Sequence, residues 1–513
     1  MASIRARLAQ KPPGYRYTIG RVLAIYGAIM LALLLAALDQ TIVATALPRI
    51  ITDLGGLRSY SWVITGYVLA MAVTVPLYGK LGDIYGRRRL YIVAISIFLL
   101  GSALCGLAQS LDQLIVFRVV QGMGAGGLFA LALATIGAIV PPRDRGRYQG
   151  LIGATFAAGS ILGPALGGLI VDNASWRWIF YVNLPVGALA LAVIAIAIPK
   201  RTQRREHSLD LFGAALLAIA TSGFLVGLVW GGQEYPWVSV EVIGAFVIAA
   251  IAVSVFIFVE RHAEEPILPF EFLRRPVVAA AVASIGLSAM AMVGTIAFVP
   301  LFVQGVIGTS ATSSGVVLTP FMLGAVTASA LSGQWISRTG RYRPNALVGP
   351  VVLGTGLFLL STMDTSTTNA RAASYMVIAG VGLGLMMQVF VIAIQNQVPL
   401  RAIGSATALG QFTRSIGATL GVTMMGVIVN HGLPSAAVIQ SQEVHRLPPD
   451  LRESLANALQ PAFLAASGLC LITLTIVAIW LKEVPLRREL EELPSASTPE
   501  AAQPEVVSRE ARA

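Results

Sequence analysis

The feature that most constrains this sequence is a series of fourteen long apolar runs, each of a length that spans a lipid bilayer. A bilayer core of about 30 Å needs roughly 20 apolar residues in a helix. Because the runs are continuous and do not alternate in polarity, they predict helices and exclude a β-barrel. Only 12% of the residues are charged, against about 25% in a soluble protein. The predicted spans are 22–47, 61–79, 91–109, 113–139, 149–171, 178–198, 211–231, 240–259, 277–305, 315–336, 345–363, 372–397, 404–430 and 462–481.

Basic residues predict which side of the membrane each loop faces. If the N-terminus lies inside, 28 of the 36 Lys and Arg residues fall in inner segments and 6 in outer loops, while Arg118 and Arg414 lie within spans. This excess is the positive-inside pattern, and it predicts that both termini are cytoplasmic. The net charge of +11 therefore reflects topology, and we expect no nucleic-acid partner. High Ala, Gly and Arg usage favours a bacterial chain, located in the inner (plasma) membrane.

A short motif occurs twice, each time in a loop expected on the inner side. Residues 79–89 and 333–343 share the pattern Gly-x3-Asp/Ser-x2-Gly-Arg. The two loops occupy matching positions in two six-span halves if the two middle spans are an insertion, and repeated halves indicate a transporter. We therefore expect an all-α membrane protein with fourteen transmembrane helices, arranged as two six-helix bundles with two inserted helices between them in the sequence. Its parts are a cytoplasmic N-terminal segment (1–21), a first six-helix bundle (22–198), a linker with two inserted helices (199–276), a second six-helix bundle (277–481) and a disordered cytoplasmic tail (482–513).

Further motifs accompany this loop in five spans. They are Leu38-Asp39-Gln-Thr41-Ile-Val, Arg118-Val-Val-Gln121-Gly122, Gly159-x3-Gly163-Pro164-x2-Gly167-Gly168, Trp176-Arg177-Trp178-Ile-Phe-Tyr-Val-Asn183-Leu-Pro185-Val-Gly and Gln411-x2-Arg414-x2-Gly417. In combination they resemble the major facilitator superfamily, specifically its fourteen-span drug:proton antiporters, over roughly residues 20–430. The resemblance implies a monomeric secondary active exporter of lipophilic, drug-like compounds. Such a protein works by alternating access, needs no cofactor and is driven by the proton gradient.

Asp39 is the only carboxylate well inside a core span. A charge inside the membrane costs about 2.5–3.5 kcal/mol on insertion scales, so it is a functional candidate. At 1.5 Å per residue, Asp39 lies about 13 Å and Arg118 about 8 Å from the outer ends of their spans. The similar depths predict an ion pair. We expect Asp39 to be the proton-coupling acid, with a static ion pair as the alternative, and the resemblance implies that Arg118 modulates its protonation.

The first copy of the repeated loop is the expected cytoplasmic gate, formed by Gly79, Asp83, Gly86, Arg87 and Arg88. Glycine permits a tight turn between the two helices. The carboxylate can pair with the loop arginines or face the N-terminus of a helix from the other half. The resemblance implies that such contacts close the cytoplasmic side, whereas the alternative is that the arginines serve topology only. The second copy has Ser where the first has Asp, so we expect a weaker contact there.

The fifth span carries Gly159, Gly163 and Gly167 on one helix face, followed by Gly168. Small residues at this spacing allow close helix packing, and Pro164 can kink the helix. The resemblance marks this motif as an antiporter feature. Close packing without any bearing on transport direction is the alternative.

The expected substrate cavity draws on polar or aromatic side chains within spans, namely Trp62, Gln304, Gln388, Gln411 and Arg414. Methionine and aromatic residues near them suit varied apolar ligands, although ordinary helix packing is the alternative for each. Arg414 has no acid in its own span, so its partner must be Asp39, polar groups, water or an anionic substrate. Spans 9 to 14 contain no acid. That absence argues against export of divalent cations and favours singly charged, zwitterionic or neutral lipophilic compounds, lipids included.

Other function classes find no support in the sequence. No Gly-x4-Gly-Lys-Ser/Thr loop occurs, so we do not expect ATP to drive transport. The four histidines and two cysteines form no metal-binding pattern, and no nucleophile–base arrangement indicates an enzyme. Two alternatives stay open, a lipid or cell-envelope precursor transporter on the same fold and, more remotely, a passive uniporter or channel. The expected partners are a small lipophilic substrate, protons and the bilayer.

Overall fold

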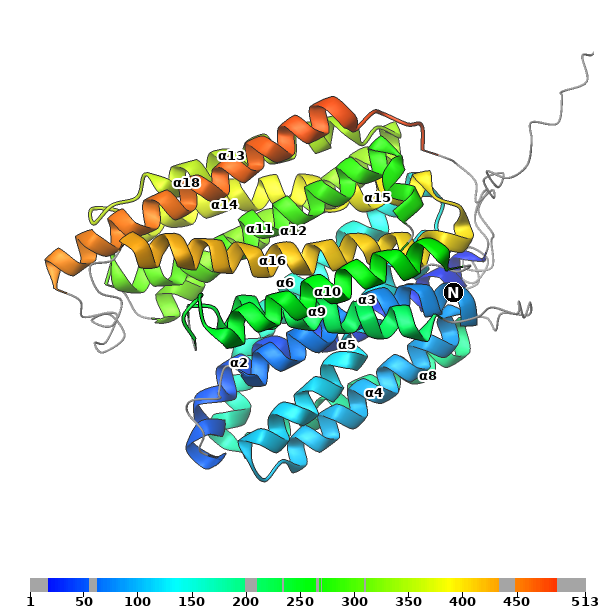
Figure 1. Ribbon diagram of the computed structural model, residues 1–513, viewed down its shortest axis with the longest axis horizontal. Helices are drawn as coiled ribbons and strands as arrows, with labels where there is room; N and C mark the ends of the chain where they lie inside the picture. Colours follow the sequence, from blue (N-terminus) through cyan, green and yellow to red (C-terminus); the bar gives the residue numbers. More distant parts are fainter. Residues whose placement is uncertain are drawn as a thin grey trace, which may run out of the picture.

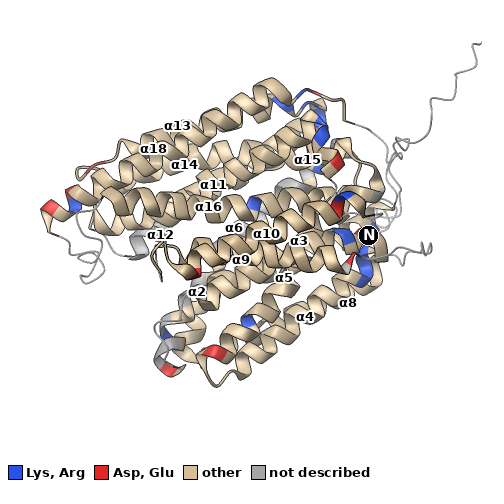
Figure 2. Cartoon of the chain, in the orientation of Figure 1, with Lys and Arg blue, Asp and Glu red and all other residues tan. Residues whose placement is uncertain are grey.

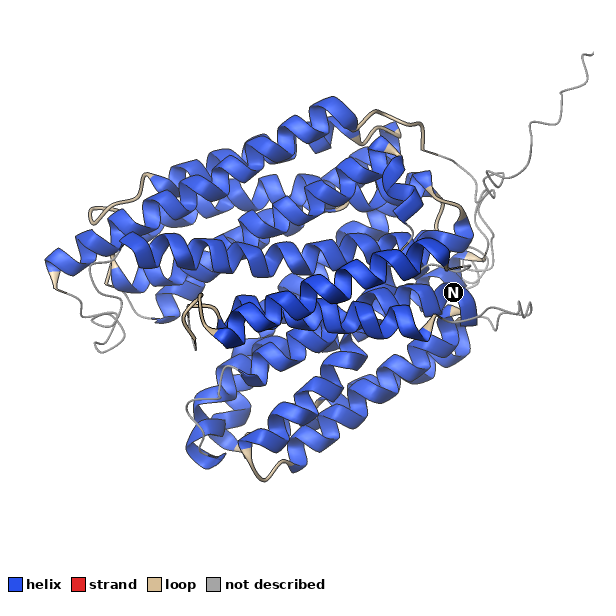
Figure 3. Ribbon diagram, in the orientation of Figure 1, coloured by secondary structure: helices blue, strands red, loops and turns tan. Residues whose placement is uncertain are grey.

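The computed structural model describes residues 17–54, 62–198, 210–232, 235–263, 267–268, 270–308, 311–432 and 448–486. Within these ranges nearly the whole chain is helical and no β-strand forms (Figure 3). The long helices run lengthwise through one bundle (Figure 1). An all-α bundle is the class that continuous apolar runs predict, because backbone N–H and C=O groups in lipid must find partners within the chain.

Along the chain, the helices form two large sets, and a pair of helices lies between these sets in the sequence. The first set is α2 (Ile19–Leu54), α3 (Trp62–Tyr85), α4 (Arg87–Leu107), α5 (Leu111–Ile139), α6 (Pro142–Asn173), α7 (Trp178–Tyr181) and α8 (Asn183–Ala197). The pair is α9 (Leu211–Trp230) and α10 (Val240–His262). After the 3₁₀ turn η2 (Phe270–Arg274), the second set is α11 (Pro276–Gly305), α12 (Ala311–Thr339), α13 (Arg343–Ser361), α14 (Asn369–Met387), α15 (Val389–Gln397), the turn η3 (Leu400–Ala402), α16 (Ile403–Gly432) and α18 (Pro449–Trp480).

Twelve helical segments in the described part of the chain are long and apolar enough to cross a membrane. Each coincides with one of the fourteen spans expected from the sequence. The two other expected spans correspond to α6 and α12, which are helical over 32 and 29 residues but are not among the twelve. The count of fourteen therefore stays a prediction.

Two expected spans differ in shape from a single straight helix. The sixth is divided into α7 and α8 near Val182. Pro185 lacks the N–H group that would bond to Tyr181, so the helix is interrupted where that bond would form. The last span begins much earlier than expected, because α18 starts at Pro449 and continues through Pro461. The stretch expected as an outer loop thus includes the first turns of the final helix.

The two sets of helices share one packing pattern. In the first set α2 packs on α6 and α8, while α5 packs on α3 and α4. In the second set α11 packs on α16 and α18, while α14 packs on α12 and α13. The same order of contacts in both sets is what an internal repeat produces.

The buried side chains follow the same division. One apolar cluster extends from Leu217 to Leu486 and is built mainly from the second set. Two others lie within residues 22–198, with Ala408 of α16 as their single member from the second set. Each half therefore has its own core.

The pair α9 and α10 lies at the side of the two halves. The two helices pack on each other, and α9 also contacts α3 and α16. Large apolar side chains of α10 are exposed, among them Ile243, Val247 and Ile251 at 48%, 50% and 60%. An exposed apolar surface of this kind suits contact with lipid.

Lys and Arg residues gather at one end of the bundle, where the described chain begins (Figure 2). We call it the basic end. It includes the starts of α4 and α13 at Arg87 and Arg343, and the first turn of α6 at Arg145. These helix starts follow the loops that the count of basic residues predicts to be inside.

Candidate functional site

Asp39 of α2 and Arg118 of α5 form a buried ion pair in the first half. The guanidinium Nη1 atom donates to Asp39 Oδ2 at 2.5 Å, and the side chains are 0% and 1% exposed. The two helices bring these residues to the same depth, as their positions in the spans predict. Such a pair offsets its loss of hydration only when the remaining polar atoms also find partners.

The carboxylate of Asp39 has those further partners. Its Oδ1 atom accepts hydrogen bonds from Gln121 Nε2 and from Asn183 Nδ2, each at 2.8 Å. Asn183 also donates to Ser102 Oγ at 3.0 Å. The carboxylate is therefore held by side chains from α5 and α8, and through Asn183 it is linked to α4.

Arg118 is held equally well. Its Nη1 atom also donates to Gln121 Oε1 at 2.8 Å, and Nε donates to the carbonyl oxygen of Val63 at 3.2 Å. The guanidinium lies over the ring of Tyr67, 4.1 Å from its centre, which adds a cation–π contact. A change in the charge of Asp39 would thus be felt by α2, α3, α4, α5 and α8 together.

Three residues of this network, Gln121, Asn183 and Ser102, are absent from the site set expected from the sequence. Gln121 and Asn183 stand inside the motifs that carry the family resemblance, which was a usable signal. A polar side chain inside an apolar span was a second signal, because it costs free energy unless it is hydrogen-bonded. Neither signal says which helix the partner comes from.

The glycine motif of α6 packs directly against the part of α2 that carries Asp39. Thr41, two residues after the acid, donates to the carbonyl oxygen of Gly159 at 3.0 Å. A Cβ atom at Gly163 would overlap the Thr41 side chain. Gly167 is buried, whereas a Cβ atom at Gly168 would meet nothing within 4 Å. The side chain of Pro164 lies outside the described residues.

At the basic end, Asp83 of α3 reaches the first turn of α16 in the other half. Its carboxylate accepts hydrogen bonds from the backbone N–H groups of Gly404 and Ser405 at 3.2 and 2.9 Å, and from Ser405 Oγ at 3.1 Å. Arg87 also donates to it, at 3.1 Å. An anion at a helix N-terminus is stabilised by the free N–H groups and the helix dipole. We call this contact the first latch.

The other residues of the first loop fit this contact. A Cβ atom at Gly79 would lie 2.9 Å from the carbonyl oxygen of Gly404, so a glycine is needed for α3 to approach α16. Gly86 has a φ angle of 89°, which glycine adopts without strain. Arg88, next to Arg87, is only partly buried.

The second copy of the loop makes a matching contact with reversed polarity, which we call the second latch. Ser337 Oγ of α12 donates to Asp144 Oδ1 of α6 at 3.1 Å. Gly340 has a φ angle of 72°, like Gly86 in the first copy. Because Ser337 has no charge, this contact is expected to be weaker than the first latch, and the carboxylate in it comes from α6.

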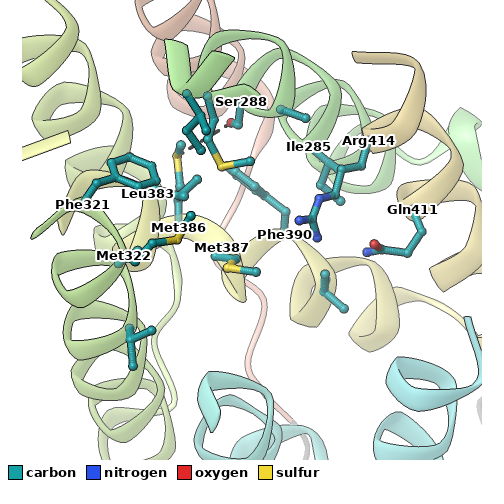
Figure 4. A pocket seen from close by; sticks show the side chains of 16 residues that line it. Ile285, Ser288, Phe321, Met322, Leu383, Met386, Met387, Phe390, Gln411 and Arg414 are labelled. Carbon is teal, nitrogen blue, oxygen red and sulfur yellow. Dashed lines mark hydrogen bonds between the residues drawn. The ribbon is translucent and has the colours of Figure 1, made fainter. Parts of the chain in front are cut away.

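A cavity of about 180 Å³ lies among the helices of the second half. Arg414 and Gln411 reach it from α16, across from Met387 and Phe390 (Figure 4). Its wall is otherwise mainly apolar. Two of the five residues expected to form a substrate cavity therefore meet here.

The other three lie elsewhere. Trp62 begins α3 and contacts Trp230 of α9, with ring centres 6.3 Å apart. Gln388 is buried at the junction of α14 and α15, and Gln304 is near the end of α11. None of them lines this cavity. Among the described residues, no group of three or more His, Cys, Asp or Glu side chains is placed to bind a metal ion.

The arrangement of two matching sets of long helices is shared with known proteins. Residues 29–422 match the sequence family described as the Major Facilitator Superfamily. The chain belongs to this superfamily. As a member of it, the protein is a multi-pass membrane transporter for small molecules.

Curated superfamily relatives cover most of the chain. The multidrug transporter protein MdtP of Bacillus subtilis (strain 168) is 39% identical over 411 residues, which are 80% of this chain and 75% of that protein. Multidrug resistance protein 3 of the same organism is 38% identical over 400 residues, 78% of each chain. The solved structure of the superfamily proton:xylose symporter XylE has a TM-score of 0.63 at 13% identity, covering 90% of this chain and 96% of that one. The last comparison concerns the fold alone.

Proposed function

We propose that this chain exports lipophilic, drug-like compounds in exchange for protons, by alternating access. The observation that carries the proposal is the buried Asp39–Arg118 pair with its surrounding hydrogen bonds. A carboxylate inside a membrane transporter is suited to take up and release a proton. A channel needs no such group. The names of the multidrug relatives support drug-like compounds as substrates.

Protonation of Asp39 has a direct route to helix packing. A neutral carboxyl group no longer attracts Arg118 as an anion does, and one of its oxygens becomes a hydrogen-bond donor. The bonds to Gln121 and Asn183 must then be rearranged, and with them the contacts of α2 with α5 and α8. Gly159 and Gly163 of α6, which pack on the same part of α2, would carry this change toward the second half.

The two latches give the proposed cycle its gate. Asp83 with Ser405 and Ser337 with Asp144 join the halves at the basic end. If that end is cytoplasmic, as the positive-inside pattern predicts, the arrangement is closed to the cytoplasm. We further propose a fourteen-span drug:proton antiporter in which α6 and α12 also cross the membrane. It would act as a monomer in a bacterial inner membrane, with both termini in the cytoplasm and no cofactor.

The test uses full-length protein in liposomes with an acidic lumen. Three radiolabelled probes share one apolar body and differ in permanent charge: 4-butylbenzenesulfonate, 4-butylbenzenesulfonamide and 4-butylphenyltrimethylammonium. We expect at least one probe to accumulate in the lumen, and accumulation to stop when nigericin and potassium remove the pH gradient. Asp39→Asn should reduce accumulation to the level of empty liposomes. Glu241→Gln, which alters an exposed acid at the start of α10, should transport normally.

Two results would contradict the proposal. Uptake that is the same with and without the gradient would indicate a passive uniporter. Driven uptake that persists in Asp39→Asn would show that the proton is carried elsewhere. Size-exclusion profiles of each variant exclude misfolding as the cause of a loss.

A further inference from the structure

Arg414 is a cation on the wall of the cavity, and no hydrogen bond or ion pair connects it to any side chain that the structure describes. It lies eleven residues after the start of α16, which corresponds to about 16 Å along the helix. Between residues 276 and 432 the sequence contains one acidic residue, Asp364. That carboxylate lies in the loop between α13 and α14, where it accepts hydrogen bonds from Ser366. Helices α11 to α16 thus offer no carboxylate to Arg414. The acids of the remaining helix of this half, Asp450 and Glu453, lie exposed in the first turns of α18, and no ion pair connects either of them to Arg414.

The rest of the cavity wall is apolar and adaptable. Four methionines, Met292, Met322, Met386 and Met387, line it together with two phenylalanines. Methionine side chains are flexible and polarisable, so they pack against ligands of different shape. The polar side chains near the arginine are Gln411 and, farther along the wall, Ser288 (Figure 4). None of the lining residues is acidic.

A guanidinium in such a place is incompletely satisfied. It has lost part of its hydration without gaining an acceptor among the described residues, and an unpaired charge in apolar surroundings is costly. Arginine is also the side chain whose planar fork of N–H donors best matches a carboxylate or another oxyanion. An anionic group on a ligand would supply the missing acceptors. A cationic ligand would meet repulsion with nothing to offset it.

We propose that this cavity binds lipophilic organic anions, with the anionic group paired to Arg414 and the apolar body against the methionine and phenylalanine side chains. Its volume of about 180 Å³ is below the roughly 300–1,000 Å³ of sites that enclose drug-sized compounds. The cavity therefore holds the acidic end of a ligand with one ring or a short alkyl chain. That the bound anion is exported rests on the proposed function, whereas its binding does not.

The experiment measures equilibrium binding of the three 4-butylphenyl probes to full-length protein in phosphatidylcholine nanodiscs, without any gradient. Wild type should bind the sulfonate at least about tenfold more tightly than the sulfonamide, and should bind the ammonium compound least. Arg414→Gln should weaken sulfonate binding by about tenfold and leave sulfonamide binding within twofold. Arg414→Lys, which keeps the charge but not the fork, should retain part of the preference.

Met387→Ala is the matched control, because it removes apolar wall and keeps the cation. It should weaken the sulfonate and the sulfonamide by a similar factor. The proposal is overturned if wild type does not bind the sulfonate, if it binds the ammonium compound more tightly, or if Arg414→Gln weakens sulfonate and sulfonamide equally. If the sulfonate does not bind as proposed, another probe can still be transported in response to the proton gradient, and Asp39→Asn can still abolish that transport. Failure of proton-driven transport would leave the binding result unaffected.

Discussion

Asp39 in the first half and Arg414 in the second half are both charged residues within long helices, but their surroundings differ. The carboxylate of Asp39 accepts hydrogen bonds from Arg118, Gln121 and Asn183 and has no exposed surface. Arg414 borders a cavity and makes no such bond with the described residues. One charge is satisfied by the protein itself and the other is not. The difference is consistent with the two proposals, a proton-coupling site in the first half and a ligand site in the second.

The same asymmetry extends to the basic end. In both latches the carboxylate belongs to the first half, on α3 at Asp83 and on α6 at Asp144. The hydroxyl groups that meet them, Ser405 and Ser337, belong to the second half. The first half thus supplies the acid of the proposed proton site and the acids of both latches. Helices α11 to α16 of the second half contain no acid, which leaves Arg414 available to the proposed ligand.

The largest effect on stability is expected at Arg118, the partner of Asp39. Arg118→Gln leaves a buried carboxylate without its counter-ion, and breaking a buried pair in this way costs about 3–5 kcal/mol. We expect the free energy of unfolding, measured by titration from mild to denaturing detergent, to fall by about that amount.

The double variant Asp39→Asn/Arg118→Gln separates charge from packing. It contains no unpaired charge, so it should be more stable than Arg118→Gln, with a coupling energy above about 1 kcal/mol in the double-mutant cycle. It should still fail to accumulate any probe. Equal stability of the double variant and Arg118→Gln would mean that the ion pair is not what holds this network.

Residue type and position in a span predicted part of this site. A lone acid and a lone arginine at similar depths had few other ways to be satisfied, so their pairing followed from helix geometry. The contribution of Asn183 did not follow in the same way, because it depends on the rotation of α8 about its axis. Consecutive helix residues differ by about 100° in direction, and an apolar span buried on several sides gives little indication of which face is which.

The expected cavity illustrates the same limit. Gln388 and Gln411 are both amides in apolar spans, yet only Gln411 lines the cavity. The sequence also did not predict that the carboxylate of the second latch comes from α6, since Asp144 and Ser337 are far apart in the chain. Pairing between the halves is set by tertiary packing, for which a single sequence carries no direct signal.

An intermediate effect is expected at the latches. Asp83→Asn removes the charge that faces the N-terminus of α16, a loss of about 1–2 kcal/mol. Hydrogen–deuterium exchange of the peptide containing Gly404 and Ser405 should accelerate by roughly 5- to 30-fold. Ser337→Ala removes one hydroxyl donor, and exchange in the first turn of α6 should accelerate less, by about 2- to 10-fold. Equal acceleration of exchange in the two variants would contradict the expectation that the first latch is the stronger of the two contacts.

The smallest effect is expected at Arg414, and it tests the comparison from its other side. Arg414→Gln takes away a charge that no carboxylate in the described part of the chain is paired with, so it leaves no unpaired carboxylate there. The free energy of unfolding without ligand should change by less than about 1 kcal/mol, or even rise, because replacing an uncompensated buried charge by a neutral group relieves its desolvation. The same replacement at Arg118 is expected to be several times more damaging. If the two arginines proved equally important for stability, Arg414 would have a protein partner of its own. In that case the contrast between the halves and the anion-binding cavity would both be wrong. If only Arg118 stabilises the protein while Arg414 governs the binding of the sulfonate probe, the two arginines have different roles. Arg118 then holds the fold and the proposed proton site together, and Arg414 binds the ligand.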